Sequence, residues 1–230
     1  MEYLLTGLML ILTLGAYLFS RYLGTKYRNP LLNVVVVSAA LVITVLLIFH
    51  VPYAIYQPGK EFVTILLGPV TICLAVPLYN HRALVKKHWL PIAMGVCLAS
   101  SIGVISVMSI AQMAGLPRDM VISLGSKSVT APVAAEVATV NGGDPGLAIA
   151  FVIVTGTLGS IAGPAILTFL KVTSPIIRGL ALGSVSHGQG MAIALLEGEQ
   201  QGIMAGIGMA LSAVITSTLI PLLLPIIFSF

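Results

Sequence analysis

The chain alternates between long apolar stretches and short polar segments along its whole length. A bilayer core about 30 Å thick needs about 20 apolar residues in a helix, so stretches of this length are typical of membrane-spanning helices. The polar segment at 51–60 carries two prolines and is expected to be a loop. The pattern predicts apolar spans at 3–19, 31–49, 62–79 (interrupted at Gly68-Pro69), 90–114, 147–170 and 202–230, where Pro221 and Pro225 could kink the last.

Two further apolar stretches, 120–140 and 179–196, are each interrupted by a polar cluster. The clusters share a Leu-Gly-Ser-x-Ser core, at 124–128 and at 182–186, followed by hydroxyl or amide side chains. Gly and Pro interrupt a helix, and the backbone groups that are freed inside a membrane need partners. Paired interruptions of this kind are the best sequence indication of a transporter's binding site.

Composition agrees with a membrane protein. Of the 230 residues, 58% are hydrophobic and only 8% are charged, whereas a soluble domain usually carries about 25% charged residues. The net charge of +4 resides in short loops, so it indicates membrane orientation and no nucleic-acid partner. Cys73 and Cys97 lie in apolar stretches and are interpreted as core residues. The N-terminal stretch lacks a basic leader and a cleavage site and is interpreted as a retained span.

Lys and Arg concentrate at 21–28 and 81–88, which are therefore expected on the cytoplasmic side, with the N-terminus outside. The path of the first interrupted stretch decides the location of Lys171 and Arg178. If the stretch crosses the membrane, both residues are outside, against the positive-inside rule; if it dips in and returns, both are inside. The rule favours the dipping path, and the crossing path stays open.

On the dipping path, a span followed by an interrupted stretch at about 90–140 is repeated at about 147–197, with entry from the opposite side. This is an inverted repeat, in which binding sites form near the middle of the membrane. The N-termini of the half-helices carry partial positive charge, so we expect them to converge with Lys127 on an anion. The predicted substrate-binding residues are Ser126, Lys127, Ser128, Thr130, Ser184, Ser186, His187 and Gln189.

The ionisable residues have alternative interpretations. Lys127 binds an anion or a buried partner, or it extends to the membrane interface. His187 couples protons or contacts substrate, because imidazole changes charge near neutral pH, or it is an interior histidine bonded to a carbonyl. Glu136 carries protons or is solvated near the membrane exit. Arg178 is expected at the interface.

The serine-rich clusters do not predict an enzyme. The sequence around Ser184 lacks the Gly-x-Ser-x-Gly elbow, and no acid is placed to orient His187. The histidines are scattered, so we expect no catalytic residues, no metal site and no cofactor beyond a coupling H⁺ or Na⁺. Pairs of glycines four residues apart at 159–163, 179–183 and 202–206 are interpreted as helix-packing positions.

The two polar clusters also carry a family resemblance. The sequence Lys-Ser-Val-Thr-Ala-Pro at 127–132 resembles the Lys-Ser-Val-Thr-Thr-Pro motif of the LrgB/CidB family, as does Arg-Gly-Leu-Ala-Leu-Gly at 178–183 followed by Ser186-His187. The likeness covers nearly the whole chain. Ser126 stands where the family usually has Pro, Ala131 replaces Thr, and 188–191 departs from the usual Ala-Ile-Gly-Thr, which weakens any transfer of fine substrate specificity.

The resemblance implies two functions. Bacterial members are described as antiholin-like modulators of murein hydrolase activity and autolysis, often encoded beside a small LrgA/CidA-type membrane protein. A longer chloroplast relative is a glycolate/glycerate transporter, and some bacterial systems are linked to pyruvate movement. Carboxylate flux would change pH at the envelope, so an effect on autolysis could follow from transport.

We therefore predict an all-α polytopic protein of the bacterial cytoplasmic (inner) membrane, with an inverted repeat and two discontinuous or re-entrant helical segments. It is expected to carry a small monocarboxylate of the glycolate, glycerate or pyruvate type by alternating access, coupled to a proton or cation. Residues 1–80 are expected to form a scaffold and homodimer interface, and residues 81–230 the transport unit. The alternative is an antiholin-like regulator of cell lysis that assembles with a small LrgA/CidA-type protein.

Overall fold

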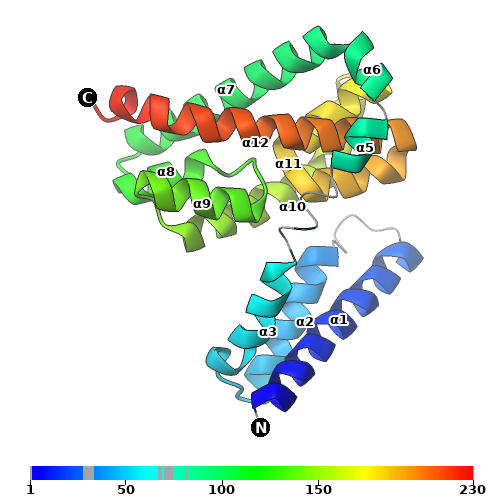
Figure 1. Cartoon of the computed structure of the whole chain (residues 1–230), viewed down its shortest axis with the longest axis vertical. Helices are drawn as coiled ribbons and strands as arrows, with labels where there is room; N and C mark the ends of the chain where they lie inside the picture. Colours follow the sequence, from blue (N-terminus) through cyan, green and yellow to red (C-terminus); the bar gives the residue numbers. More distant parts are fainter. Residues whose placement is uncertain (1, 28–33, 67–68, 70–74, 81, 230) are drawn as a thin grey trace. The chain divides into compact units, whose positions relative to one another are not determined.

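The computed structural model describes residues 2–27, 34–66, 69, 75–80 and 82–229, and within these residues all regular structure is helical (Figure 1). This confirms the predicted all-α class. Four described helices are long and apolar enough to cross a membrane, at Leu4–Tyr27, Trp89–Met113, Pro145–Phe169 and Glu199–Ile227.

The chain forms two compact units, Met1–Cys73 and Leu74–Phe230. The functional division into a scaffold at 1–80 and a transport unit at 81–230 stays a prediction.

The first unit contains α1 (Glu2–Tyr27), α2 (Val34–Ile48) and α3 (Tyr53–Ile65). The loop expected at 51–60 is wrong, because α3 begins at Tyr53 and continues through Pro58. Packing on α1 explains the difference. The Thr13 and Tyr56 hydroxyls lie 3.0 Å apart, and the absence of a side chain at Gly59 lets α3 approach α1 closely. The span expected at 62–79 begins in the last turn of α3, which ends at Ile65, and ends in α5 (Ala75–Asn80). Gly68, where an interruption was expected, lies outside the described residues.

The second unit is built on three long helices, α7 (Trp89–Met113), α10 (Pro145–Phe169) and α12 (Glu199–Ile227), with short helices α5 and α6 (Arg82–Lys87) at one end. Helices α7 and α12 run parallel, because contacts follow in the same order along both: Ile92 with Met204, then Ser100 with Ser212 at 3.1 Å, then Met108 with Ile220. Helix α12 stays helical through both of its prolines.

Helix α10 runs antiparallel to α12. Val152, in its first half, packs in a cluster with Ala213, whereas Leu167, near its end, packs in a cluster with Ala205. The three long helices therefore alternate in direction in the way that a chain crossing a membrane several times requires.

The first interrupted stretch is a helical hairpin. Helix α8 (Arg118–Gly125) ends at the first polar cluster, and α9 (Ala131–Asn141) leads back to α10. The Ser123 hydroxyl on α8 donates to the Asp144 carbonyl (3.0 Å) and accepts from the Asp144 amide (2.9 Å), just beyond the end of α9. The chain beyond α9 therefore returns to the side of α8, and the choice between the dipping and the crossing path stays a prediction.

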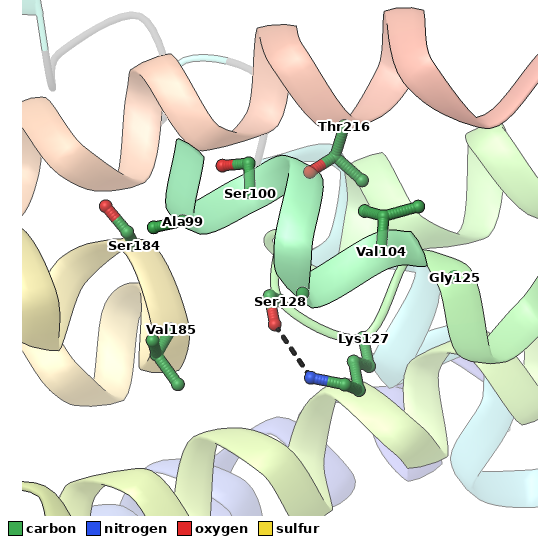
Figure 2. A pocket seen from close by; sticks show the side chains of 10 residues that line it. Ala99, Ser100, Val104, Gly125, Lys127, Ser128, Ser184, Val185 and Thr216 are labelled. Atoms are coloured by element: carbon green, nitrogen blue, oxygen red, sulfur yellow. Dashed lines mark hydrogen bonds between the residues drawn. The ribbon is translucent and has the colours of Figure 1, made fainter. Parts of the chain in front are cut away.

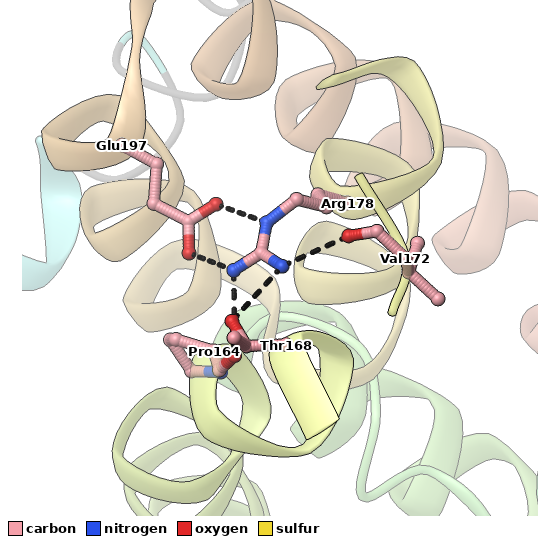
Figure 3. Close-up of polar contacts among 5 residues, drawn as sticks. All are labelled: Pro164, Thr168, Val172, Arg178 and Glu197. Carbon is pink, nitrogen blue, oxygen red and sulfur yellow. Dashed lines mark hydrogen bonds and ion pairs between the residues drawn. The ribbon is translucent and has the colours of Figure 1, made fainter. Parts of the chain in front are cut away.

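The second interrupted stretch also folds back on itself. Helix α11 (Pro175–Glu197) is interrupted at His187, whose backbone has φ 43° and ψ −128°. Arg178 and Glu197 are separated by 19 positions, yet their side chains pair at 2.6 Å (Figure 3). A straight helix would place them about 28 Å apart at 1.5 Å per residue. The halves before and after His187 therefore form a hairpin closed at its base by this ion pair.

The two hairpins enter the second unit from opposite ends. The Arg118 guanidinium, at the start of the first hairpin, lies 4.6 Å from the Phe228 ring centre just beyond α12. Gly179, near the start of the second hairpin, packs directly on the backbone of Gln201 at the beginning of α12. Opposite entry is what an inverted repeat requires, and the symmetry of the repeat stays a prediction.

Candidate functional site

A cavity of about 70 Å³ lies where both hairpins approach α7 and α12 (Figure 2). One water molecule needs about 10–15 Å³ of such space, so the cavity has room for several waters or for a small organic molecule. Each hairpin and each of the two long helices contributes to its wall. The lining residues are Ala99, Ser100, Gly103, Val104, Gly125, Lys127, Ser128, Ser184, Val185 and Thr216.

The cation of the cavity is Lys127, which follows the end of α8 by two residues. Its half-buried side chain donates from Nζ to the Ser128 hydroxyl at 3.2 Å. Among the residues that the structure describes, no acidic side chain lies within ion-pair distance of Lys127. A lysine charge inside a membrane is costly without a partner, so the site favours an anion beside this ammonium group.

Two hydroxyls in the cavity wall lack hydrogen-bond partners. Ser184 is 6% exposed and Thr216 is 1% exposed, and neither side-chain oxygen has a hydrogen-bond partner among the described residues. A buried polar group left unpaired costs about 1–3 kcal/mol, and nearly all such groups in folded proteins are paired. Both oxygens are buried in this structure and the Ser184 oxygen faces Gly208 on α12, so these side chains must turn before they can bond with the contents of the cavity.

Glycines allow the hairpins to come close enough to α12 and α7 to form this wall. A methyl group at Gly183 would overlap the backbone of Ala205, and one at Gly125 would lie 2.9 Å from the Met108 sulfur. The expected packing role of the glycine pairs applies at 179–183, where both glycines contact the α12 backbone. The same glycines place Ser184 beside the cavity, because it directly follows Gly183.

The cavity is lined by the C-terminal end of α8 and the residues just beyond it (Gly125, Lys127 and Ser128) and by the C-terminal end of the first half of α11 (Ser184 and Val185). The expectation that half-helix N-termini line the site is therefore wrong for this cavity. The N-terminal residues of α9 and of the second half of α11 are not among its lining residues. Because C-terminal ends carry partial negative charge, they stabilise the Lys127 ammonium, and attraction for an anion comes from that side chain.

Two residues of the first cluster that were predicted to bind substrate make hydrogen bonds within the turn between α8 and α9 and do not line the cavity. The buried Ser126 hydroxyl donates to the Ser123 carbonyl at 2.9 Å, which satisfies a backbone group at the end of α8. Thr130 precedes α9 and its carbonyl accepts the Ala134 amide at 2.8 Å. Neither lines the cavity. Their predicted contact with substrate stays a prediction.

The remaining residues of the second cluster face α10. His187 donates from Nε2 to the Val152 carbonyl at 3.0 Å, and Gln189 accepts from the Thr157 hydroxyl at 3.3 Å. Gly156 makes room for the imidazole, because a methyl group there would lie 2.6 Å from Nε2. His187 is therefore an interior histidine bonded to a carbonyl, which was one of the two interpretations that the sequence allowed.

Proton coupling by His187 or Glu136 stays a prediction. Glu136 is exposed on α9 and lines neither the cavity nor the groove described next.

A second space, a groove of about 450 Å³, lies between α10 and the first half of α11. Ser186 is its buried polar residue, 1% exposed and with an unpartnered hydroxyl. Val185 lines both this groove and the cavity. The other lining residues are mostly apolar or small: Thr155, Leu158, Gly159, Ala162, Gly163, Ile166, Leu167, Ala181 and Leu182.

Sequence reasoning missed two residues of the cavity and one contact at the base of the second hairpin. Ser100 and Thr216 lie in long apolar stretches whose pattern gives no sign that these hydroxyls reach the cavity. Arg178 donates to both oxygens of Glu197 and to the carbonyls of Pro164 and Val172 (Figure 3). Arg178 and Glu197 flank the interrupted stretch 179–196, which was the available signal for their pairing, and the interfacial position of Arg178 stays a prediction.

The long apolar helices and the buried hairpins define a multi-pass membrane protein. The chain belongs to the LrgB-like family, whose model matches residues 13–226. It is 37% identical over 215 residues to the protein YxaC of Bacillus subtilis, covering 94% of each chain. It is also 36% identical over 223 residues to a Staphylococcus epidermidis protein named holin-like protein CidB, covering 97% of each chain. No solved structure matches the chain.

Proposed function

We propose that the protein transports small monocarboxylates of the glycolate, glycerate or pyruvate type across the bacterial cytoplasmic membrane. The observation that carries the proposal is the cavity lined by Lys127, Ser184 and Thr216. In the part of the chain that the structure describes, its ammonium group has no acidic partner and its two buried hydroxyls have no hydrogen-bond partner. A carboxylate would accept hydrogen bonds from the Lys127 ammonium and the Ser128 hydroxyl, and a second oxygen of the substrate would bond with the Ser184 and Thr216 hydroxyls once these side chains turn toward the cavity.

The size and charge of the cavity favour this substrate class. Its volume of about 70 Å³ suits molecules of a few heavy atoms, and its described lining contains one cation and no acidic residue. Because no catalytic or metal-binding arrangement is expected, the protein is proposed to move its substrate unchanged, with no cofactor other than a coupling H⁺ or Na⁺.

Alternating access fits two hairpins that enter from opposite ends and meet at one cavity. Movement of either hairpin against α7 and α12 would open the cavity to one side at a time. His187 and Glu136 are the proposed proton carriers, and the C-terminal end of α8 offers partial negative charge to a coupling cation. We further propose a homodimer formed through residues 1–80, with the N-terminus outside.

The test is uptake of labelled glycolate, glycerate and pyruvate into proteoliposomes by the parent and by the Lys127→Ala variant. The parent is expected to exceed empty liposomes for at least one acid, and Lys127→Ala to lose that uptake because the anion has lost its counter-charge. Lys87→Ala is the matched control, since this lysine is exposed on α6 and lines neither space. No uptake by well-folded parent protein contradicts the proposal.

A second function is favoured by the name of the relatives. The CidB proteins of two staphylococcal species are called holin-like, so this chain could instead regulate murein hydrolase activity and lysis by assembling with a small LrgA/CidA-type membrane protein. Autolysis could also follow from carboxylate flux. Measuring lysis in cells that express Lys127→Ala separates the two: a pure assembly role leaves lysis control intact, and the transport role abolishes it.

A further inference from the structure

Three consecutive residues at the end of the first half of α11 face two different spaces. Ser184 lines the cavity, Ser186 lines the groove, and Val185 lines both. Helix geometry explains the arrangement, since successive residues turn by about 100° and two residues two positions apart face nearly opposite sides. Val185 therefore stands at the boundary between a small polar space and a larger apolar one.

The two spaces suit the two ends of one kind of molecule. The cavity of about 70 Å³ holds Lys127 and hydroxyls, which suits a carboxylate. The groove of about 450 Å³ is walled largely by Leu158, Ile166 and Leu182 among other apolar residues, which suits an alkyl chain. A molecule that filled both would be a carboxylate with a chain longer than that of pyruvate, and the Val185 side chain borders the passage between them.

We propose that Val185 sets the chain length of the substrate, by closing the cavity toward the apolar groove so that only short acids are accepted. This inference rests on the proposed function and deepens it. Truncation of Val185 joins the two spaces, and the tail of a longer acid then enters the groove while its carboxylate stays beside Lys127. A bulkier residue at the same position takes space from the cavity.

The side chain can be changed without disturbing the hairpin. Val185 is 46% exposed, so its truncation leaves no buried hole. Alanine is a better helix former than valine, so Val185→Ala is expected to keep the first half of α11 intact. Leu196→Ala is the matched control, because Leu196 lies in the second half of α11, is 83% exposed and lines neither space.

The experiment compares pyruvate with 2-oxopentanoate, which adds two methylenes, in two assays. Binding is measured by the rise in melting temperature of purified protein with each acid, and transport by uptake into proteoliposomes. One methylene in an apolar pocket is worth about tenfold or more in discrimination. Val185→Ala is therefore expected to raise the ratio of 2-oxopentanoate to pyruvate by at least about tenfold. Val185→Leu is expected to raise the ratio of glycolate, a two-carbon acid measured in the same assays, to pyruvate.

The outcomes separate the two proposals. If Val185→Ala binds pyruvate as the parent does and the ratio stays unchanged, the role of Val185 is refuted. If the ratio changes in binding but no variant or parent moves any acid, the chain-length role holds and the transport proposal falls. If Leu196→Ala changes the ratio as strongly as Val185→Ala, the effect does not come from the boundary between the two spaces, and the inference is overturned.

Discussion

The ion pair at the base of the second hairpin offers the sharpest structural prediction. Arg178 and Glu197 can interact only if α11 folds back at His187, because a straight helix would hold two residues 19 positions apart at about 28 Å. We therefore expect Arg178→Ala and Glu197→Ala each to destabilise the protein, and the double variant to cost less than the sum of the two.

The structure sets the size of the effect. Arg178 donates five hydrogen bonds, two of them to Glu197 and the others to Pro164, Thr168 and Val172. The two charged side chains are only 13% and 20% exposed. Exposed ion pairs contribute about 0.2–1 kcal/mol to stability, and breaking a fully buried pair costs about 3–5 kcal/mol. Because this pair is mostly buried, either single variant is expected to lose about 2–4 kcal/mol of unfolding free energy. The coupling between them is expected at about 1–3 kcal/mol.

The assay is thermal unfolding in detergent, followed by circular dichroism of the helices. For a protein of this size each kcal/mol corresponds to about 2–4 °C in melting temperature. Glu199→Ala is the matched control, because Glu199 is exposed two residues further along and should change little. Strictly additive losses for Arg178 and Glu197 would refute the hairpin, since side chains that do not meet cannot be coupled.

Two further predictions concern the contacts that seat the hairpins. Gly156→Ala should destabilise the protein by about 1–3 kcal/mol and lower the melting temperature by several degrees, because the new methyl group displaces the His187 imidazole from the Val152 carbonyl. Gly95→Ala is the control and should leave the melting temperature unchanged, because its methyl group meets nothing within 4 Å. Ser123→Ala should cost about 1–2 kcal/mol and speed hydrogen exchange of the Asp144 amide, which loses its acceptor. Unchanged exchange there would contradict the closed base of the first hairpin.

Much of the fold could be predicted from the sequence, because long apolar stretches have few alternatives to helices in a membrane protein. The two interruptions were also placed correctly: the first helix half ends at Gly125 and the second hairpin turns at His187, both inside the predicted polar clusters. The loop at 51–60 was mispredicted since prolines indicate turns locally, whereas Pro58 is accommodated by helix packing on α1.

The site was predicted only in part, because a sequence pattern does not show which end of a half-helix faces inward. Lys127, Ser128 and Ser184 do share one cavity, but His187 turns toward α10. Thr216 was missed because a single hydroxyl in a long apolar helix is commonly bonded to its own backbone. Its lack of a partner becomes visible only once the hairpins are packed around it.

Both hairpins reach one shared cavity, and cysteine cross-linking across that cavity would show their proximity in the membrane protein. In a protein with Cys73 and Cys97 replaced by serine, Ser128→Cys and Ser184→Cys are introduced together and treated with a short bifunctional maleimide. We expect efficient cross-linking within the chain for this pair. We expect little for a control pair that combines Ser184→Cys with Glu136→Cys, since Glu136 lies on the exposed face of α9. Equal cross-linking of both pairs, or none between positions 128 and 184, would contradict the shared cavity.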